Sequence, residues 1–304
     1  MSSASKRRRV TSIVVALAIA GAAAASAGAT ELPSQVSTNW AGYAAITGTS
    51  THAFARRFRN VSGTWTQPVA TCVPGQPTFA AFWVGLGGYR QSSQSLEQVG
   101  TEADCSAAGA TSYYAWYEYV PSGPRTIHLV PIAAGDTVTA NVAVIAKRAT
   151  VTLTDTTTGA TFTHTKTMRT PRPDVGAAEW IAEAPSNCDR NTCTPLTLTN
   201  FGAVVFSNAT ATSVGNAGAH TGAINDPDWT YGAINLQDNG GGLRFSHDMH
   251  SSATVGALAA TGDAFSVTYT GEPPVLGGPT GPSGTSGPSG SSGASGPTGA
   301  TGTS

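Results

Sequence analysis

Short runs that are either apolar or alternate between apolar and polar residues recur along most of this chain. Clear examples are residues 138–144, 149–154, 203–206 and 264–269, which are rich in Val, Thr, Ala and aromatic residues. A period of two is typical of strands, and the Gly, Asn, Asp and Pro between the runs are typical of turns. Residues 156–159, Thr-Thr-Thr-Gly, predict a hairpin turn. Helical periodicity is nearly absent from the body of the chain, so we predict an all-β fold, an antiparallel two-sheet β-sandwich.

The two ends of the chain depart from this pattern. A basic cluster, an apolar run over residues 10–25 and small residues after it predict a secretory signal peptide at residues 1–27. The apolar run is short for a bilayer span of roughly 20 residues, which argues against a membrane anchor. We expect a short exposed lead-in at residues 28–36, one folded domain at 37–271 and a low-complexity tail at 272–304.

The tail has the period of collagen. A glycine stands at every third position from Gly278 to Gly302, and proline follows several of these glycines. The array is short and poor in proline for a triple helix, which favours a disordered spacer over weak trimerisation. We therefore expect a monomer, with a weak tail-mediated trimer as the alternative.

Cysteine and charge usage narrow the class of protein further. The four cysteines fit an oxidising, extracellular compartment and allow three pairings, and proximity in the sequence favours Cys188–Cys193 with Cys72–Cys105 as the remaining pair. Their spacing does not suit zinc, and we expect no metal. Net charge is −1 and no basic stripe follows the signal, which argues against a nucleic-acid partner. No second long apolar run occurs, so we expect no membrane contact after signal removal.

Three of the predicted strands combine aromatic or apolar residues with a carboxyl or amide. Alternate residues of a strand share a face, so each polar group has companions on its own side. These sets are Leu96, Gln98 and Gly100; Tyr114, Trp116 and Glu118; and Glu179, Ile181 and Glu183. A Glu can take a proton from water and return it to a leaving amine. A Gln amide can orient that water and donate a hydrogen bond to the oxyanion.

Several segments resemble, in the same order, the motifs of the glutamic peptidases, also called eqolisins or family G1. The matching segments are Ser37-Thr38-Asn39-Trp40-Ala41-Gly42, Val61-Ser62-Gly63-Thr64-Trp65-Thr66-Gln67-Pro68, Phe82-Trp83-Val84-Gly85-Leu86, Leu96-Glu97-Gln98-Val99-Gly100, Ala115-Trp116-Tyr117-Glu118 and Ala178-Glu179-Trp180-Ile181-Ala182-Glu183. The resemblance covers most of the body of the chain, from Asn39 to about Tyr269.

The resemblance implies a fold, a site and an activity. The fold would be a lectin-like sandwich with a cleft on one concave sheet. Glu183 would be the general base and Gln98 the amide that holds water and oxyanion. The cleft would be lined by Trp40, Trp83, Trp116 and Glu118. The protein would be a secreted endopeptidase that cleaves proteins and peptides at acidic pH without a cofactor.

This chain also departs from the family pattern near the expected cleft. Tyr114 stands where fungal members have an acid, and Glu102 stands where they have Asp. The loop after Gly85 carries Gly87-Gly88-Tyr89 instead of acids. We expect these changes to alter subsite preference and to move the pH optimum upward.

A non-catalytic, lectin-like carbohydrate-binding module is the alternative. A sandwich lined with Trp and Tyr suits sugar stacking, and Asn225-Asp226-Pro227-Asp228 could hold calcium, although this sequence is more typical of a turn. The paired Gln98 and Glu183 motifs favour the peptidase, because a lectin does not need them. EDTA distinguishes the two classes, since it would abolish calcium-dependent sugar binding and leave the peptidase active.

Overall fold

The computed structural model describes the body of the chain in five segments. They are residues 29–47, 57–188, 193–216, 218–237 and 252–271. The signal peptide expected at residues 1–27 and the tail expected at 272–304 lie outside the described residues and stay predictions.

The described segments contain strands and no helix, which confirms the all-β prediction. The strands are β1 (Thr30–Glu31), β2 (Gln35–Ser37), β3 (Trp40–Ile46), β4 (Arg57–Thr66), β5 (Ala81–Gly87), β6 (Leu96–Cys105), β7 (Thr111–Tyr119), β8 (Ser122–Ile127), β9 (Thr137–Ile145), β10 (Arg148–Asp155), β11 (Thr161–Thr167), β12 (Ala177–Glu183), β13 (Ser186–Cys188), β14 (Cys193–Pro195), β15 (Ala203–Gly215), β16 (Gly218–Ala223), β17 (Thr230–Gln237), β18 (Ser252–Val255) and β19 (Phe265–Tyr269). No helix among the described residues is long and apolar enough to cross a membrane.

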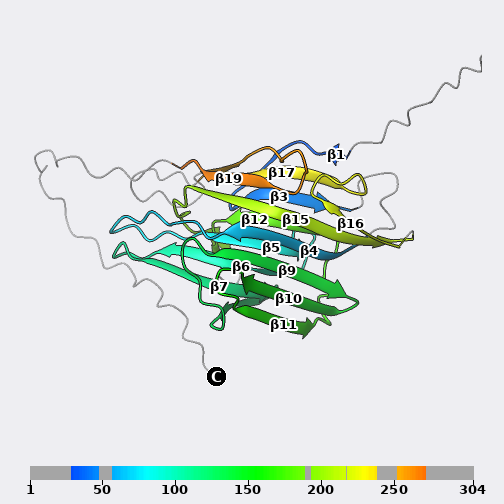
Figure 1. Ribbon diagram of the computed structural model, residues 1–304, viewed down its shortest axis with the longest axis horizontal. Coiled ribbons are helices and arrows are strands. Elements are labelled where there is room, and N and C mark those ends of the chain that lie inside the picture. Colours follow the sequence, from blue (N-terminus) through cyan, green and yellow to red (C-terminus); the bar gives the residue numbers. More distant parts are fainter. Residues whose placement is uncertain (1–28, 48–56, 189–192, 217, 238–251, 272–304) are drawn as a thin grey trace, which may run out of the picture.

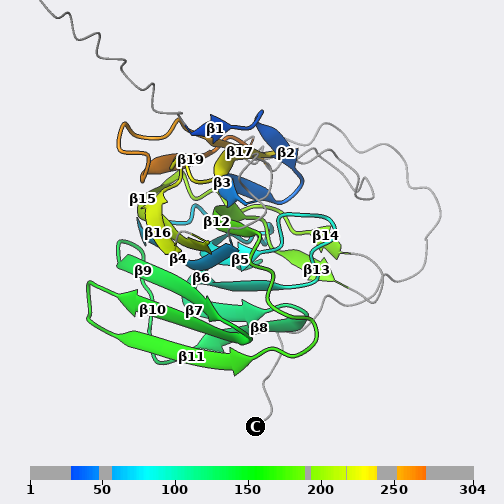
Figure 2. The same ribbon diagram turned by 90° about the vertical axis from the view of Figure 1, so that its right-hand side faces the viewer.

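The strands form two packed layers, as Figures 1 and 2 show. One layer runs β8-β7-β6-β5-β12-β3-β17, and the other runs β19-β15-β4-β9-β10-β11 with β16 beside β15. Strand β18 pairs with both β17 and β19, so hydrogen bonds continue from one layer into the other. Almost all pairs are antiparallel, which confirms the predicted sandwich.

The segment expected as a lead-in takes part in the sheet. Strands β1 and β2 pair in parallel with β17, although their side chains are largely exposed. The sheet therefore begins before residue 37, because backbone groups at the edge of β17 are available for pairing whatever the side chains are.

The core lies between the two layers and follows from strand alternation. Along β12, Ala178, Trp180 and Ala182 belong to the main buried cluster. Ile181 belongs to a second cluster on the other face of the same layer. Because alternate residues face opposite sides, Glu183 shares the face of Ile181 and not that of the core. The same alternation on β5, β6 and β7 gives this layer one apolar face for the core and one face for a site.

Two disulfide bonds tie loops to this framework. Cys72 is bonded to Cys105 at the end of β6, and Cys188 is bonded to Cys193 across the β13–β14 pair. The Cys188–Cys193 pairing that sequence proximity favoured and the remaining Cys72–Cys105 pairing are both confirmed. The described residues contain no free cysteine.

Candidate functional site

The site-bearing face of the first layer is built from β12, β5, β6 and β7. Ile181, Trp83, Gly100 and Trp116 lie in one row across these strands, because each pairs in register with the next. Glu183 lies two residues beyond this row on β12. Gln98 and Glu118 lie two residues from it on β6 and β7, where they pair with each other.

Glu183 is held by hydrogen-bond donors on two sides. Asn39 Nδ2 donates to Oε1 at 2.9 Å, and Trp83 Nε1 donates to Oε2 at 2.8 Å. Both donors lie on strands or turns beside β12, since β12 pairs with β3 and with β5. Each carboxylate oxygen can accept a second hydrogen bond, so a water molecule can still bind to Glu183.

The surroundings raise the pKa of Glu183 to about 7. Burial is the main cause, because it disfavours the charged form. The donors on Trp83, Trp40 and Asn39 act in the opposite direction, and the charge of Glu118 raises the pKa further. A carboxyl with such a pKa is a stronger base than an ordinary Glu once it is ionised.

Gln98 is fixed by a short contact to Glu118. Its Nε2 donates to Glu118 Oε2 at 2.6 Å, while its Oε1 is buried and has no partner among the described residues. An ionised carboxylate only accepts hydrogen bonds, so this contact determines which end of the amide faces Glu118. Burial raises the pKa of Glu118, and the hydrogen bond from Gln98 lowers it.

The structure thus forms two small groups from the residues expected in the site. Glu183 is grouped with Trp83, Asn39 and Trp40, and Gln98 is grouped with Glu118. Within the described residues no hydrogen bond joins Gln98 to Glu183. The two groups interact electrostatically, through the effect of Glu118 on the pKa of Glu183.

The three tryptophans expected to line a cleft have different surroundings. Trp83 is fully buried and packs edge-on against Trp40, with ring centroids 5.1 Å apart. Trp116 is nearly buried, and its indole Nε1 has no acceptor in the described part of the protein. Leaving a buried N–H without an acceptor costs about 1–3 kcal/mol, so a substrate carbonyl at Trp116 would be stabilised.

A second set of titratable groups extends β6 past Gln98. Glu102 pairs in register with Tyr114, and the Tyr114 hydroxyl donates to Asp104 Oδ2 at 3.2 Å. Burial raises the pKa of Asp104 to about 6. Burial and the neighbouring charges of Asp104 and Glu183 raise the pKa of Glu102 well above its usual range. At acidic pH these groups carry protons and little charge.

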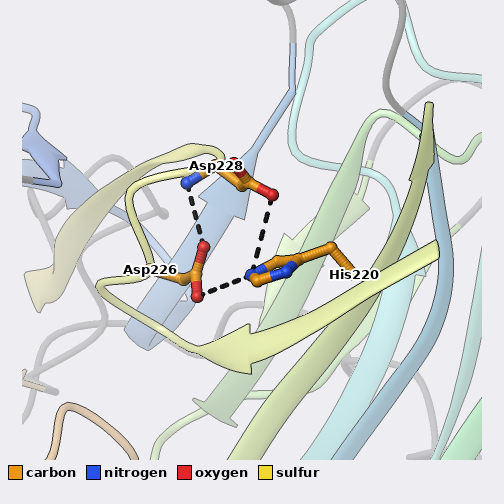
Figure 3. A group of neighbouring side chains, drawn as sticks. All are labelled: His220, Asp226 and Asp228. Carbon is orange, nitrogen blue, oxygen red and sulfur yellow. Dashed lines mark hydrogen bonds and ion pairs between the residues drawn. The ribbon is translucent and has the colours of Figure 1, made fainter. Parts of the chain in front are cut away.

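A histidine and two aspartates converge away from this face, between β16 and the turn before β17 (Figure 3). His220 Nε2 lies 2.9 Å from Asp226 Oδ2 and 3.6 Å from Asp228 Oδ2. The backbone N–H of Asp228 donates to Asp226 Oδ1, as expected for the turn that the sequence favours. These contacts explain the arrangement without an ion.

Two residues of the site were not singled out from the sequence. Asn39 stood in an opening motif with no role assigned, because its partner Glu183 is 144 positions away. Asp104 shares the alternation of Gln98 and Glu102 along β6, and this periodicity was the signal that could have identified it.

The fold and this face together define a class, a β-sandwich with paired carboxyl and amide groups on one face of a sheet. The model of the Peptidase A4 family matches residues 38–256. The chain belongs to this family, the glutamic peptidases or eqolisins. The sequence resemblance to that family is thereby confirmed.

Individual relatives agree with the assignment. Aspergillopepsin-2 of Aspergillus niger is 33% identical over 139 residues, which is 45% of this chain and 47% of that protein. The chain therefore spans about half the length of this relative. Scytalido-glutamic peptidase, solved with a transition-state analogue inhibitor, matches at a TM-score of 0.53 and 20% identity, over 77% of this chain and 98% of that one. SCP-B, a member of the eqolisin family solved with the tripeptide Ala-Ile-His, matches at a TM-score of 0.50 and 20% identity. This match also covers 77% of this chain and 98% of that one. These structures support the fold.

Proposed function

We propose that this protein is a secreted endopeptidase that uses Glu183 and Gln98. Glu183 acts as the general base that takes a proton from water and then returns it to the leaving amine. Gln98 orients the water and donates a hydrogen bond to the tetrahedral oxyanion. The observation that carries the proposal is that Trp83 and Asn39 both donate to Glu183, on the same face of the sheet as the Gln98–Glu118 contact.

Each group has a defined task in this mechanism. The two donors hold the Glu183 carboxylate in one orientation and leave lone pairs for water. Glu118 takes one N–H of Gln98, so the amide oxygen and the second N–H are left for water and substrate. No covalent intermediate and no metal are required. Membership in the family supports proteins and peptides as the substrate class.

The working pH follows from coupled carboxyls. Catalysis needs an ionised base, and the pKa of Glu183 is about 7. The negative charge of Glu118 contributes to this raised pKa, so most of Glu183 keeps its proton in weakly acidic solution. We expect activity to rise with pH up to about 7, so the optimum lies higher than for a protease whose acids have ordinary pKa values.

Secretion is part of the proposal. The disulfide bonds suit an oxidising compartment, and the N-terminal sequence has the features of a signal peptide. Mass spectrometry of protein exported by the native host, with a new N-terminus near residue 28, would support this point.

The test is cleavage of a denatured protein from about pH 2 to 8. We expect Glu183→Gln to lower kcat/KM by about 10²–10⁴-fold and Gln98→Ala by about 10²–10³-fold, with EDTA without effect. Glu31→Gln, an exposed carboxyl far from the site in sequence, is the matched control and should keep full activity.

Circular dichroism and thermal unfolding must show that each variant is folded. A folded wild-type protein that cleaves nothing at any pH would contradict the proposal and favour the carbohydrate-binding alternative. Variants of Glu183 or Gln98 as active as wild type would overturn the assignment of the site.

A further inference from the structure

A separate hollow lies where the edges of the two layers meet. It has a volume of about 330 Å³ and is formed by β7, β8 and β11. Tyr117 and Tyr119 line it, and along β7 they alternate with Trp116 and Glu118, which face the site. The hollow therefore opens on the other side of the sheet from Glu183 and Gln98. Figure 2 shows β7, β8 and β11 together at the lower edge of the molecule.

The floor of this hollow is rigid and aromatic. Tyr117 packs against the imidazole of His164, with ring centroids 4.9 Å apart and an angle of 31° between the planes. The Tyr119 hydroxyl donates to the backbone oxygen of His164 at 2.9 Å, which ties β7 to β11. Both tyrosines are almost fully buried, so their positions are set by packing and not by solvent.

The rim is cationic. Lys166 Nζ donates to Ser122 Oγ at 2.6 Å and lies 5.6 Å from the centre of the Tyr119 ring. Arg125 is opposite Tyr117 in the β7–β8 register and is exposed. Together with His164, these groups give the hollow three side chains that can carry positive charge, and none of the described residues that line it is a carboxylate.

The carboxyl of Glu97, behind the floor of the hollow, does not offset this positive charge in weakly acidic solution. Glu97 pairs in register with Tyr119 and is fully buried. Burial raises the pKa of Glu97 to about 8, so it is neutral in the weakly acidic range. The cations of the rim therefore act on a ligand without a counter-charge beneath them.

We propose that this hollow binds a small molecule with two or more oxyanionic groups, such as carboxylates, sulfates or phosphates. Arginine matches such groups with two parallel N–H donors, and lysine adds a point charge. The volume equals that of about eleven water molecules at about 30 Å³ each, which is more than one phosphate fills. A polycarboxylate or a molecule with two phosphate groups uses the space better. A ligand here does not contact the opposite face of the sheet, which carries Glu183 and Gln98.

The test is isothermal titration at about pH 5 with citrate and pyrophosphate as separate probes, and with inorganic phosphate as the comparison that has a single oxyanionic group. We expect saturable one-to-one binding of citrate or pyrophosphate, tighter than that of inorganic phosphate. The Arg125→Gln and Lys166→Gln double variant should bind it at least about tenfold more weakly, because the charge-assisted hydrogen bonds are lost. Arg57→Gln, which removes an exposed cation on β4, is the matched control and should bind as wild type does.

Arg125→Gln alone serves as a second variant, because an exposed side chain can be replaced without disturbing the fold. Preference for citrate would identify carboxylates as the ligand groups, and preference for pyrophosphate would identify phosphates. No saturable binding, or equal affinity in the double variant and wild type, would overturn the proposal. Peptide cleavage by the same variants is measured separately and should be unchanged, so this result and the test of the peptidase activity are independent.

Discussion

At the scale of single residues, the state of Glu183 depends on neighbours that strand pairing brings to it. Burial raises its pKa, while the indole of Trp83 and the amide of Asn39 favour the ionised form. The charge of Glu118 acts in the same direction as burial. These opposing effects can be separated, because each neighbour can be replaced by a residue that lacks the donor or the charge.

Trp83→Phe keeps an aromatic ring beside Glu183 and removes the N–H donor. The pKa of Glu183 should rise, because a hydrogen bond to the charged form is lost. We expect the acidic limb of the kcat/KM profile to move to higher pH by up to about 1 unit, with a loss of about tenfold at about pH 6. The measurement is the pH profile of peptide cleavage.

The matched control for this change is Trp229→Phe. Its indole Nε1 donates to the backbone oxygen of Ile224, away from the site. This variant should lose stability and keep the wild-type profile. An unshifted profile in Trp83→Phe would show that its N–H does not control the ionisation of Glu183.

Glu118→Gln should move the same limb in the opposite direction. Removing the negative charge lowers the pKa of Glu183, by up to about 1 unit. The turnover should also fall, because a glutamine can donate as well as accept and no longer determines the orientation of the Gln98 amide. A pH profile with Glu31→Gln as the control checks this. Movement of the limb to higher pH would contradict it.

At the scale of the element, the site depends on how closely β5 and β6 approach. Gly100 on β6 pairs with Trp83 on β5, and a Cβ at Gly100 would lie 2.6 Å from Trp83 Cβ. No real Cβ makes so short a contact, so only glycine fits here. The absence of a side chain on β6 is thus what allows Trp83 to reach Glu183.

Gly100→Ala should therefore destabilise the protein and disturb the site. We expect a loss of about 2–4 kcal/mol in the free energy of unfolding, because strand and indole must both shift. Gly123→Ala on β8 is the control, since a Cβ there meets nothing within 4 Å. Urea unfolding compares the two. Equal stability of both variants would refute the steric explanation.

At the scale of the whole molecule, buried carboxyls couple folding to pH. Glu97 and Glu179 are both fully buried, and the carboxyl of Glu179 has no hydrogen-bond partner in the described part of the chain. Burial raises the pKa of Glu97 to about 8 and that of Glu179 well above its usual range. The folded state therefore holds protons that the unfolded chain releases at lower pH.

This coupling has a defined sign. Between the unfolded pKa of 4.5 and the folded pKa of about 8, the native state binds more protons than the unfolded state. The contribution of Glu97 to the free energy of unfolding is fully present below pH 4.5 and is lost as the pH rises through this window. The free energy of unfolding of the wild type should fall between about pH 4 and 7. In Glu97→Gln this fall should be smaller by about 3 kcal/mol.

Urea unfolding at the two pH values measures this difference. Glu31→Gln is again the control, because its carboxyl is exposed and should leave the slope unchanged. The pH-dependent loss of unfolding free energy that is due to Glu179 should persist in both variants. A Glu97→Gln protein with the same pH dependence as wild type would contradict the role given to Glu97.

The sequence alone determined the class of fold and the facing of the polar groups. Strand alternation has a period of two whatever the partner strand is, so it assigned Glu183 to the face of Ile181 and Gln98 to that of Leu96. Proximity along the chain was enough to predict the Cys188–Cys193 disulfide bond.

Only the tertiary structure decided which strands lie next to each other. Asn39 and Trp83 are 144 and 100 positions from Glu183, and they meet it because β12 pairs with both β3 and β5. The cationic hollow likewise needs β8 and β11, which belong to different layers. The periodicity of a strand specifies its faces, whereas its neighbours are selected by the packing of the whole core.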